Sequence, residues 1–141
     1  MFEARRILIV EDEPLIGMDL ADAVVDLNGV VIGPLPTVAE AMRILDHQSI
    51  AAAIVDAVLR DCDITSVALR LARAGIPFVV HSGTGLPPQV AAEWPDLPVI
   101  LKPARASAVA ERLLAEIRIA ANRRSDGPTE LRASYRPVVR C

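Results

Sequence analysis

Short apolar runs alternate with segments of helical periodicity along most of the chain. The runs are continuous and rich in Ile, Val, Leu and Ala, which is typical of strands buried on both faces of a parallel sheet. They cover residues 7–10, 30–32, 51–55, 77–80 and 99–101. Apolar residues recur at helical spacing in residues 16–27, 38–45, 64–71, 86–94 and 109–117, which predicts five helices.

Turn and cap residues set the expected ends of these elements. Asn28 and Gly29 close the first helix, Gly33-Pro34 ends the second strand, and Gly75 closes the third helix. Thr37 is the expected N-cap of the second helix, and the last helix is expected to fade near Asn122. Five strand–helix units in strict alternation predict a doubly wound α/β fold, (βα)5, with a five-stranded parallel sheet.

Composition agrees with one compact aliphatic domain. The chain has 141 residues, of which 52% are hydrophobic and only 3% aromatic. We expect a domain over residues 1–121 and a flexible tail over 122–141, where five arginines face two acids and Gly and Pro interrupt any pattern. The net charge of −3 argues against a nucleic-acid-binding domain.

Nothing in the sequence points to export or membrane insertion. The N-terminal apolar run stops at Glu11, so it does not resemble a signal peptide, and no run approaches the roughly 18 apolar residues of a membrane span. Cys62 and Cys141 are too few for a disulfide framework, and we expect free thiols. These features predict a cytoplasmic protein.

Polar residues follow four of the predicted strands. Glu11, Asp12 and Glu13 follow the first strand, and Asp56, Ser82 and Lys102-Pro103 follow the third, fourth and fifth. In a doubly wound sheet the ligand site lies beyond the carboxyl ends of the strands. Lys102 is the only lysine among 15 basic residues, which singles out its compact ammonium group.

This set of side chains suits phosphoryl transfer. Asp56 can act as a nucleophile and become an acyl phosphate. Clustered acids repel a phosphoryl group unless a divalent cation lies between them, and hard oxygen ligands suit Mg²⁺. Lys102 can neutralise one phosphoryl oxygen, and Ser82 can donate a hydrogen bond to another.

Here the chain resembles the response-regulator receiver family. The resemblance rests on Ile-Leu-Ile-Val-Glu-Asp-Glu-Pro at residues 7–14, on Asp56, on the hydroxyl of Ser82 and on Lys102-Pro103, and it spans residues 5 to about 120. It implies a flavodoxin-like strand order 2-1-3-4-5. The segment 75–85 is also similar to the Phe-Ala-Thr-Gly-Tyr segment of the "FAT GUY" receivers, which are commonly single-domain partners of HWE-type histidine kinases.

The resemblance assigns roles to individual residues. It implies that Asp56 accepts phosphate from a histidine kinase or phosphotransfer protein. It implies Mg²⁺ bound by Glu11, Asp12, Asp56 and the backbone carbonyl of Val58. Ser82 and Lys102 would read the phosphoryl group, and the peptide bond before Pro103 would be cis.

The sequence departs from the usual receiver pattern at several positions. His81, Ser82 and Thr84 replace the usual Ala, Thr and Tyr, and His81 is expected at the rim of the site. Val99 stands where many receivers carry a switch aromatic. Val58 is apolar where many receivers have a polar side chain that positions water, and we therefore hypothesise that Asp56-phosphate is long-lived.

Other functions stay open at this point. A haloacid-dehalogenase-like phosphatase also uses a strand-end aspartate and Mg²⁺, but that family requires Asp-x-Asp, and Asp12 is followed by Glu13 and Pro14. No nucleotide-binding glycine motif occurs. A degenerate receiver that binds partners without phosphorylation is a further alternative.

The expected output is an interaction rather than a reaction. We expect a phosphoacceptor domain rather than an enzyme in the ordinary sense, without a DNA-binding domain. A downstream protein would dock on the fourth helix, fifth strand and fifth helix, and the same face could form a homodimer.

Overall fold

The computed structural model describes residues 1–125, which form five strands and five helices in strict alternation. The strands are β1 (Arg6–Val10), β2 (Val30–Leu35), β3 (Ala52–Asp56), β4 (Phe78–Ser82) and β5 (Val99–Leu101). The helices are α1 (Pro14–Asp26), α2 (Val38–His47), α3 (Thr65–Arg73), α4 (Pro88–Glu93) and α5 (Ala106–Ser125).

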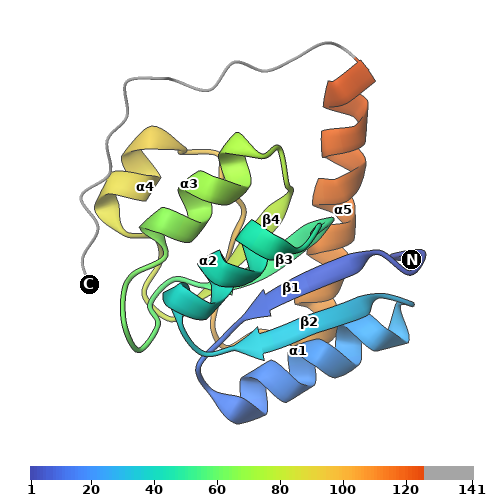
Figure 1. Cartoon of the computed structure of the whole chain (residues 1–141), viewed down its shortest axis with the longest axis horizontal. Helices are drawn as coiled ribbons and strands as arrows, with labels where there is room; N and C mark the ends of the chain where they lie inside the picture. Colours follow the sequence, from blue (N-terminus) through green and yellow to red (C-terminus); the bar gives the residue numbers. More distant parts are fainter. Residues whose placement is uncertain (126–141) are drawn as a thin grey trace.

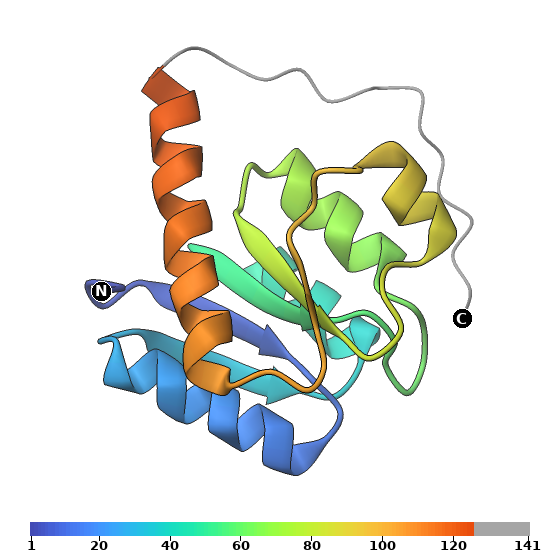
Figure 2. The same cartoon turned by 180° about the vertical axis from the view of Figure 1, so that it is seen from behind.

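All strand pairs are parallel, and the strands lie in the order β2-β1-β3-β4-β5. Helices α1 and α5 pack on one face of the sheet, and α2, α3 and α4 cover the other (Figures 1 and 2). The predicted (βα)5 doubly wound fold and its strand order are therefore confirmed.

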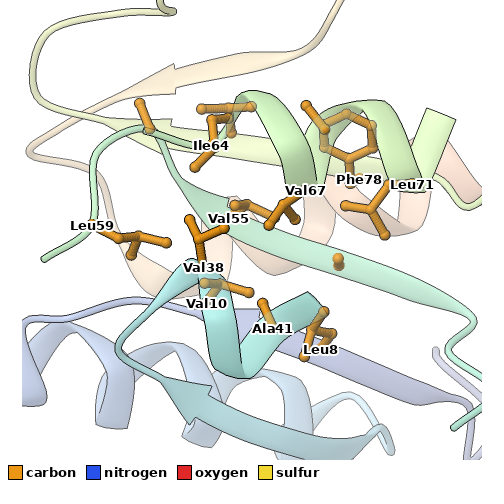
Figure 3. Close-up of a cluster of buried hydrophobic side chains, with 14 of the residues drawn as sticks. Leu8, Val10, Val38, Ala41, Val55, Leu59, Ile64, Val67, Leu71 and Phe78 are labelled. Atoms are coloured by element: carbon orange, nitrogen blue, oxygen red, sulfur yellow. The ribbon is translucent and has the colours of Figure 1, made fainter. Parts of the chain in front are cut away.

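The sheet separates two aliphatic cores, and β3 contributes to both. Ala53 and Val55 point toward α2 and α3, whereas Ala52 and Ile54 point toward α1 and α5. Figure 3 shows the core between the sheet and helices α2 and α3. Ile64 at the start of α3, together with Val67 and Leu71, packs there against Val55 and Phe78. Burying one Leu, Ile, Val or Phe side chain stabilises the fold by roughly 1.5–3 kcal/mol. The two cores together therefore hold the ends of the strands in fixed positions.

The expected end of the second strand at Gly33-Pro34 is wrong. The strand continues through both residues to Leu35, with a shift in its register against β1. A proline is tolerated here because β2 is the edge of the sheet and has a neighbour on only one side. Gly33 has φ +108°, and a Cβ at this position would lie 2.6 Å from the carbonyl oxygen of Ile9, so the strand needs glycine.

Local signals at other boundaries match the structure. Thr37 caps α2 by accepting a hydrogen bond from the backbone N–H of Glu40, and Gly75 follows α3 with φ +68°. Helix α4 is shorter than expected, and α5 continues to Ser125, beyond its expected end near Asn122. The rest of the predicted tail, residues 126–141, lies outside the described residues.

The expectation of free thiols is wrong for Cys62, which is disulfide-bonded, and Cys141 lies outside the described residues. Within residues 1–125, no helix is long and apolar enough to cross a membrane.

Candidate functional site

The carboxyl ends of β1, β3, β4 and β5 bring most of the predicted site residues to one edge of the sheet. Glu11 directly follows β1, Asp56 and Ser82 are the last residues of β3 and β4, and Lys102 directly follows β5. Parallel strands carry their ends to the same edge, so residues separated by up to 91 positions in the chain become neighbours. The site is therefore a direct consequence of the strand order.

Three carboxylates form a compact acidic group at this edge. Glu11, Asp12 and Asp56 each offer an oxygen, and these oxygens lie within 4.8 Å of one another. Glu11 and Asp56 are buried, and Asp12 is half-buried. Hard oxygen donors with room for water on one side suit Mg²⁺, which keeps several of its waters when bound. These three residues fit the predicted metal site.

Lys102 links two of the three acids. Its Nζ lies 3.1 Å from Oε1 of Glu11 and 3.1 Å from Oδ2 of Asp56. Burial acts to lower the pKa of Lys102, but the hydrogen bonds to Glu11 and Asp56 outweigh it and raise the pKa above its usual range. The only lysine of the chain is thus a fixed positive charge in the middle of the acidic group.

Glu11 is the most strongly perturbed acid of the site. Burial raises its pKa to about 7, and the neighbouring Asp56 adds to the rise, whereas Lys102 opposes it. One lysine does not compensate for placing these carboxylates together out of water. An additional cation beside Glu11 would therefore favour the ionised form of this carboxyl.

Ser82 is in place, but its hydroxyl is engaged within its own loop. It donates to the backbone carbonyl of Gly85 at 2.8 Å and accepts from the backbone N–H of Thr84 at 3.1 Å. The hydroxyl can donate to a phosphoryl oxygen only if it gives up Gly85. A ligand at the site would therefore compete with the present conformation of the β4–α4 loop.

Val58 lies in the loop after β3. Its backbone N–H faces Oδ1 of Asp56 at 3.5 Å, which is long for a hydrogen bond, and its side chain is 56% exposed. The Lys102–Pro103 peptide bond is cis.

The loop after β3 is held by residues that the sequence did not single out. Asp61 accepts hydrogen bonds from the backbone N–H groups of Val38 and Ala39 at the start of α2, at 2.9 and 3.1 Å. Arg60 donates to the carbonyl oxygen of Asp12 at 3.2 Å. These contacts tie the loop that follows Asp56 to two other elements, and only tertiary proximity reveals them.

His81 does not lie at the rim as expected. It is only 3% exposed, because it belongs to β4 and not to the loop beyond it. Burial lowers its pKa, and Lys102 lowers it further, while Asp56 and Glu13 act in the opposite direction. Burial beside the site therefore favours the neutral form of this imidazole.

Several solved structures with a similar fold are receivers. A response regulator receiver protein from Sinorhizobium medicae is 22% identical, with a TM-score of 0.71 over 85% of this chain and 99% of that chain. The receiver domain of a sensor histidine kinase from Pseudomonas aeruginosa, solved with a magnesium ion in its active-site cleft, is 18% identical, with a TM-score of 0.68 over 81% and 98%. At this identity both show the fold alone.

A third structure is similar in sequence as well. SdrG from Sphingomonas melonis is 37% identical, with a TM-score of 0.67, and the match covers 83% of this chain and 98% of SdrG. This chain belongs to the response-regulator receiver family. No protein-family model and no curated protein sequence matches the receiver.

Proposed function

We propose that this receiver is a stand-alone phosphorylation switch and that Asp56 is its phosphoacceptor. The observation that carries the proposal is the ammonium of Lys102, held between Glu11 and Asp56 inside the acidic group. The match to SdrG, which spans nearly the whole of that chain, supports a receiver that acts without a covalently attached output domain. SdrG also adopts a BeF₃-activated conformation.

The chemistry is the transfer of a phosphoryl group to a carboxylate oxygen of Asp56. An oxygen–phosphorus bond forms, and the bond between phosphorus and the donor's leaving group breaks. A magnesium ion held by Glu11, Asp12, Asp56 and the carbonyl of Val58 would neutralise charge on the phosphoryl oxygens. Lys102 would exchange part of its contact with the carboxylates for a phosphoryl oxygen.

Ser82 connects the phosphoryl group to the rest of the molecule. Its hydroxyl would leave the carbonyl of Gly85 and donate to a phosphoryl oxygen. This exchange frees the β4–α4 loop next to α4. The switch would therefore change the surface formed by α4, β5 and α5.

We propose that a downstream protein docks on this surface and that the same face can form a homodimer. Leu101 of β5 is an apolar residue that is 62% exposed at the edge of the sheet, which suits a protein contact. The proposed phosphodonor is a histidine kinase, with the HWE type as the candidate class, or a phosphotransfer protein. A cytoplasmic location is part of the same proposal.

The test is phosphorylation by a small donor. The receiver is incubated with Mg²⁺ and acetyl phosphate, and the intact mass is compared for wild type, Asp56→Asn and Asp96→Asn. Asp96 is an exposed aspartate outside the acidic group, so its variant is the matched control. A phosphate-sized gain in wild type and Asp96→Asn, but not in Asp56→Asn, supports the proposal. No gain with acetyl phosphate or with a panel of purified histidine kinases would favour a phosphorylation-independent binding module.

A further inference from the structure

A buried histidine with no hydrogen-bond partner lies beside the phosphoacceptor. His81 is 3% exposed, and neither Nδ1 nor Nε2 has a partner among the described residues. A neutral imidazole always has one N–H donor and one acceptor nitrogen. Leaving both unpaired in the interior costs free energy, so native proteins rarely do it without a reason.

The position of His81 in the sheet explains which ligand could satisfy it. His81 is the register partner of Asp56 across the β3–β4 ladder. Directly paired residues of neighbouring strands point to the same face, so the imidazole and the Asp56 carboxylate lie side by side. On its other side His81 pairs with Ile100, two residues before Lys102 on the same face. His81 therefore lies between the strand that ends at Asp56 and the strand that leads to Lys102.

We infer that His81 is a further residue of the phosphoryl site, whose ring N–H donates a hydrogen bond to the Asp56 acyl phosphate. This inference rests on the proposed function. In the unphosphorylated protein Lys102 already contacts Oε1 of Glu11 and Oδ2 of Asp56. Phosphorylation adds oxygens and nearly two negative charges at the residue beside the ring. The donor then acquires a partner only in the phosphorylated state, and it stabilises that state selectively.

Wild-type protein provides the first test, because the chain has two histidines. His47 is exposed at the end of α2 and serves as an internal reference. Imidazole nitrogen and N–H signals are recorded by NMR before and after beryllofluoride and Mg²⁺ are added as a phosphoryl mimic. We expect a slowly exchanging N–H signal of His81 to appear with the mimic, while the His47 signals stay unchanged.

Variants provide the second test. His81→Phe keeps a planar ring of similar size without a donor, and His81→Ala places the residue usual in the similar receivers at this position. His47→Phe is the matched control. A hydrogen bond to a charged acceptor corresponds to about tenfold or more in affinity, so we expect both His81 variants to bind beryllofluoride about tenfold more weakly than wild type.

The outcomes separate the two proposals. If beryllofluoride binds at Asp56 and the His81 N–H becomes protected, the inference is supported. If beryllofluoride binds at Asp56 with no change at His81, or if the N–H is already protected in the free protein, the inference is overturned and the proposed function stands. If Asp56 accepts neither beryllofluoride nor phosphate, the proposed function fails and the inference fails with it.

Discussion

The ammonium nitrogen of Lys102 lies 3.1 Å from Oδ2 of Asp56, although the two residues are 46 positions apart in the chain. The contact joins the last residue of β3 to the first residue after β5. Since the same nitrogen also reaches Glu11, one cation holds together the two most buried carboxylates of the site.

Lys102→Met should strengthen Mg²⁺ binding while it weakens the response to phosphoryl binding. The ammonium lies 3.1 Å from oxygens of two of the proposed metal ligands. Removing its positive charge at a solvated edge changes the interaction with Mg²⁺ by on the order of 1 kcal/mol, which corresponds to about fivefold in Mg²⁺ affinity. Calorimetric Mg²⁺ titration measures this effect. Lys102→Arg, which keeps the charge, is the control and should bind Mg²⁺ close to wild type. Equal Mg²⁺ affinity in Lys102→Met and wild type would contradict a direct role of the lysine charge.

Mg²⁺ affinity should rise with pH up to and through the range around pH 7. The pKa of Glu11 is raised to about 7, so below this pH the carboxyl is protonated in the metal-free protein and must lose its proton to bind the ion. Titrations at pH 5.5, 6.5 and 7.5 in two buffers should show proton release on binding, largest near or below pH 7. Glu11→Gln should bind Mg²⁺ more weakly and lose this pH dependence.

The same carboxyl should affect stability without metal. A raised pKa means that the folded state favours the protonated acid, so the contribution of Glu11 is fully present below about pH 4.5 and is lost as the pH rises through about 7. Denaturant unfolding of the metal-free protein at pH 5.5 and 8 should therefore show a larger loss of stability in wild type than in Glu11→Gln. Addition of Mg²⁺ at pH 8 should restore wild type more than the variant.

Asp61 should anchor the loop after Asp56 to the start of α2. Burial acts to raise its pKa, but hydrogen bonds from Val38 and Ala39 outweigh it and hold the pKa below the usual range. Asp61→Ala should cost about 1 kcal/mol, as for the loss of a helix cap at an exposed site. Because a lowered acid pKa stabilises only the ionised protein, this difference should be present at pH 7 and shrink as the pH falls below 4. Equal loss at pH 7 and pH 3 would show that the charge has no part in the anchor.

Val58 should make the phosphorylated state long-lived. Its exposed side chain stands two residues after the phosphoacceptor and has no polar atom that could orient an attacking water. Val58→Gln should accelerate the hydrolysis of Asp56-phosphate several-fold, because the glutamine amide can orient the attacking water by a hydrogen bond. Intact mass followed over time after removal of the donor measures the decay, with Val58→Leu as the control. Similar decay rates in the two variants would exclude this explanation of the lifetime.

The sequence by itself determined the fold of this receiver and which polar residues come together at one edge of the sheet. Continuous aliphatic strands demand burial on both faces, and alternation with helices leaves a parallel sheet as the way to achieve it. Parallel strands must end at a common edge, so the sequence alone places Glu11, Asp56, Ser82 and Lys102 near one another.

Tertiary structure decided the features that depend on neighbours from distant parts of the chain. The sequence placed the end of β2 at Gly33-Pro34, yet an edge position lets the strand continue to Leu35. It placed His81 at the rim, yet pairing with Asp56 and Ile100 extends β4 and buries the ring. The anchor from Asp61 to α2 joins positions more than 20 residues apart, which no local pattern encodes. Local propensity and periodicity describe a residue's own segment, whereas burial and partner choice depend on what packs against that segment in the folded chain.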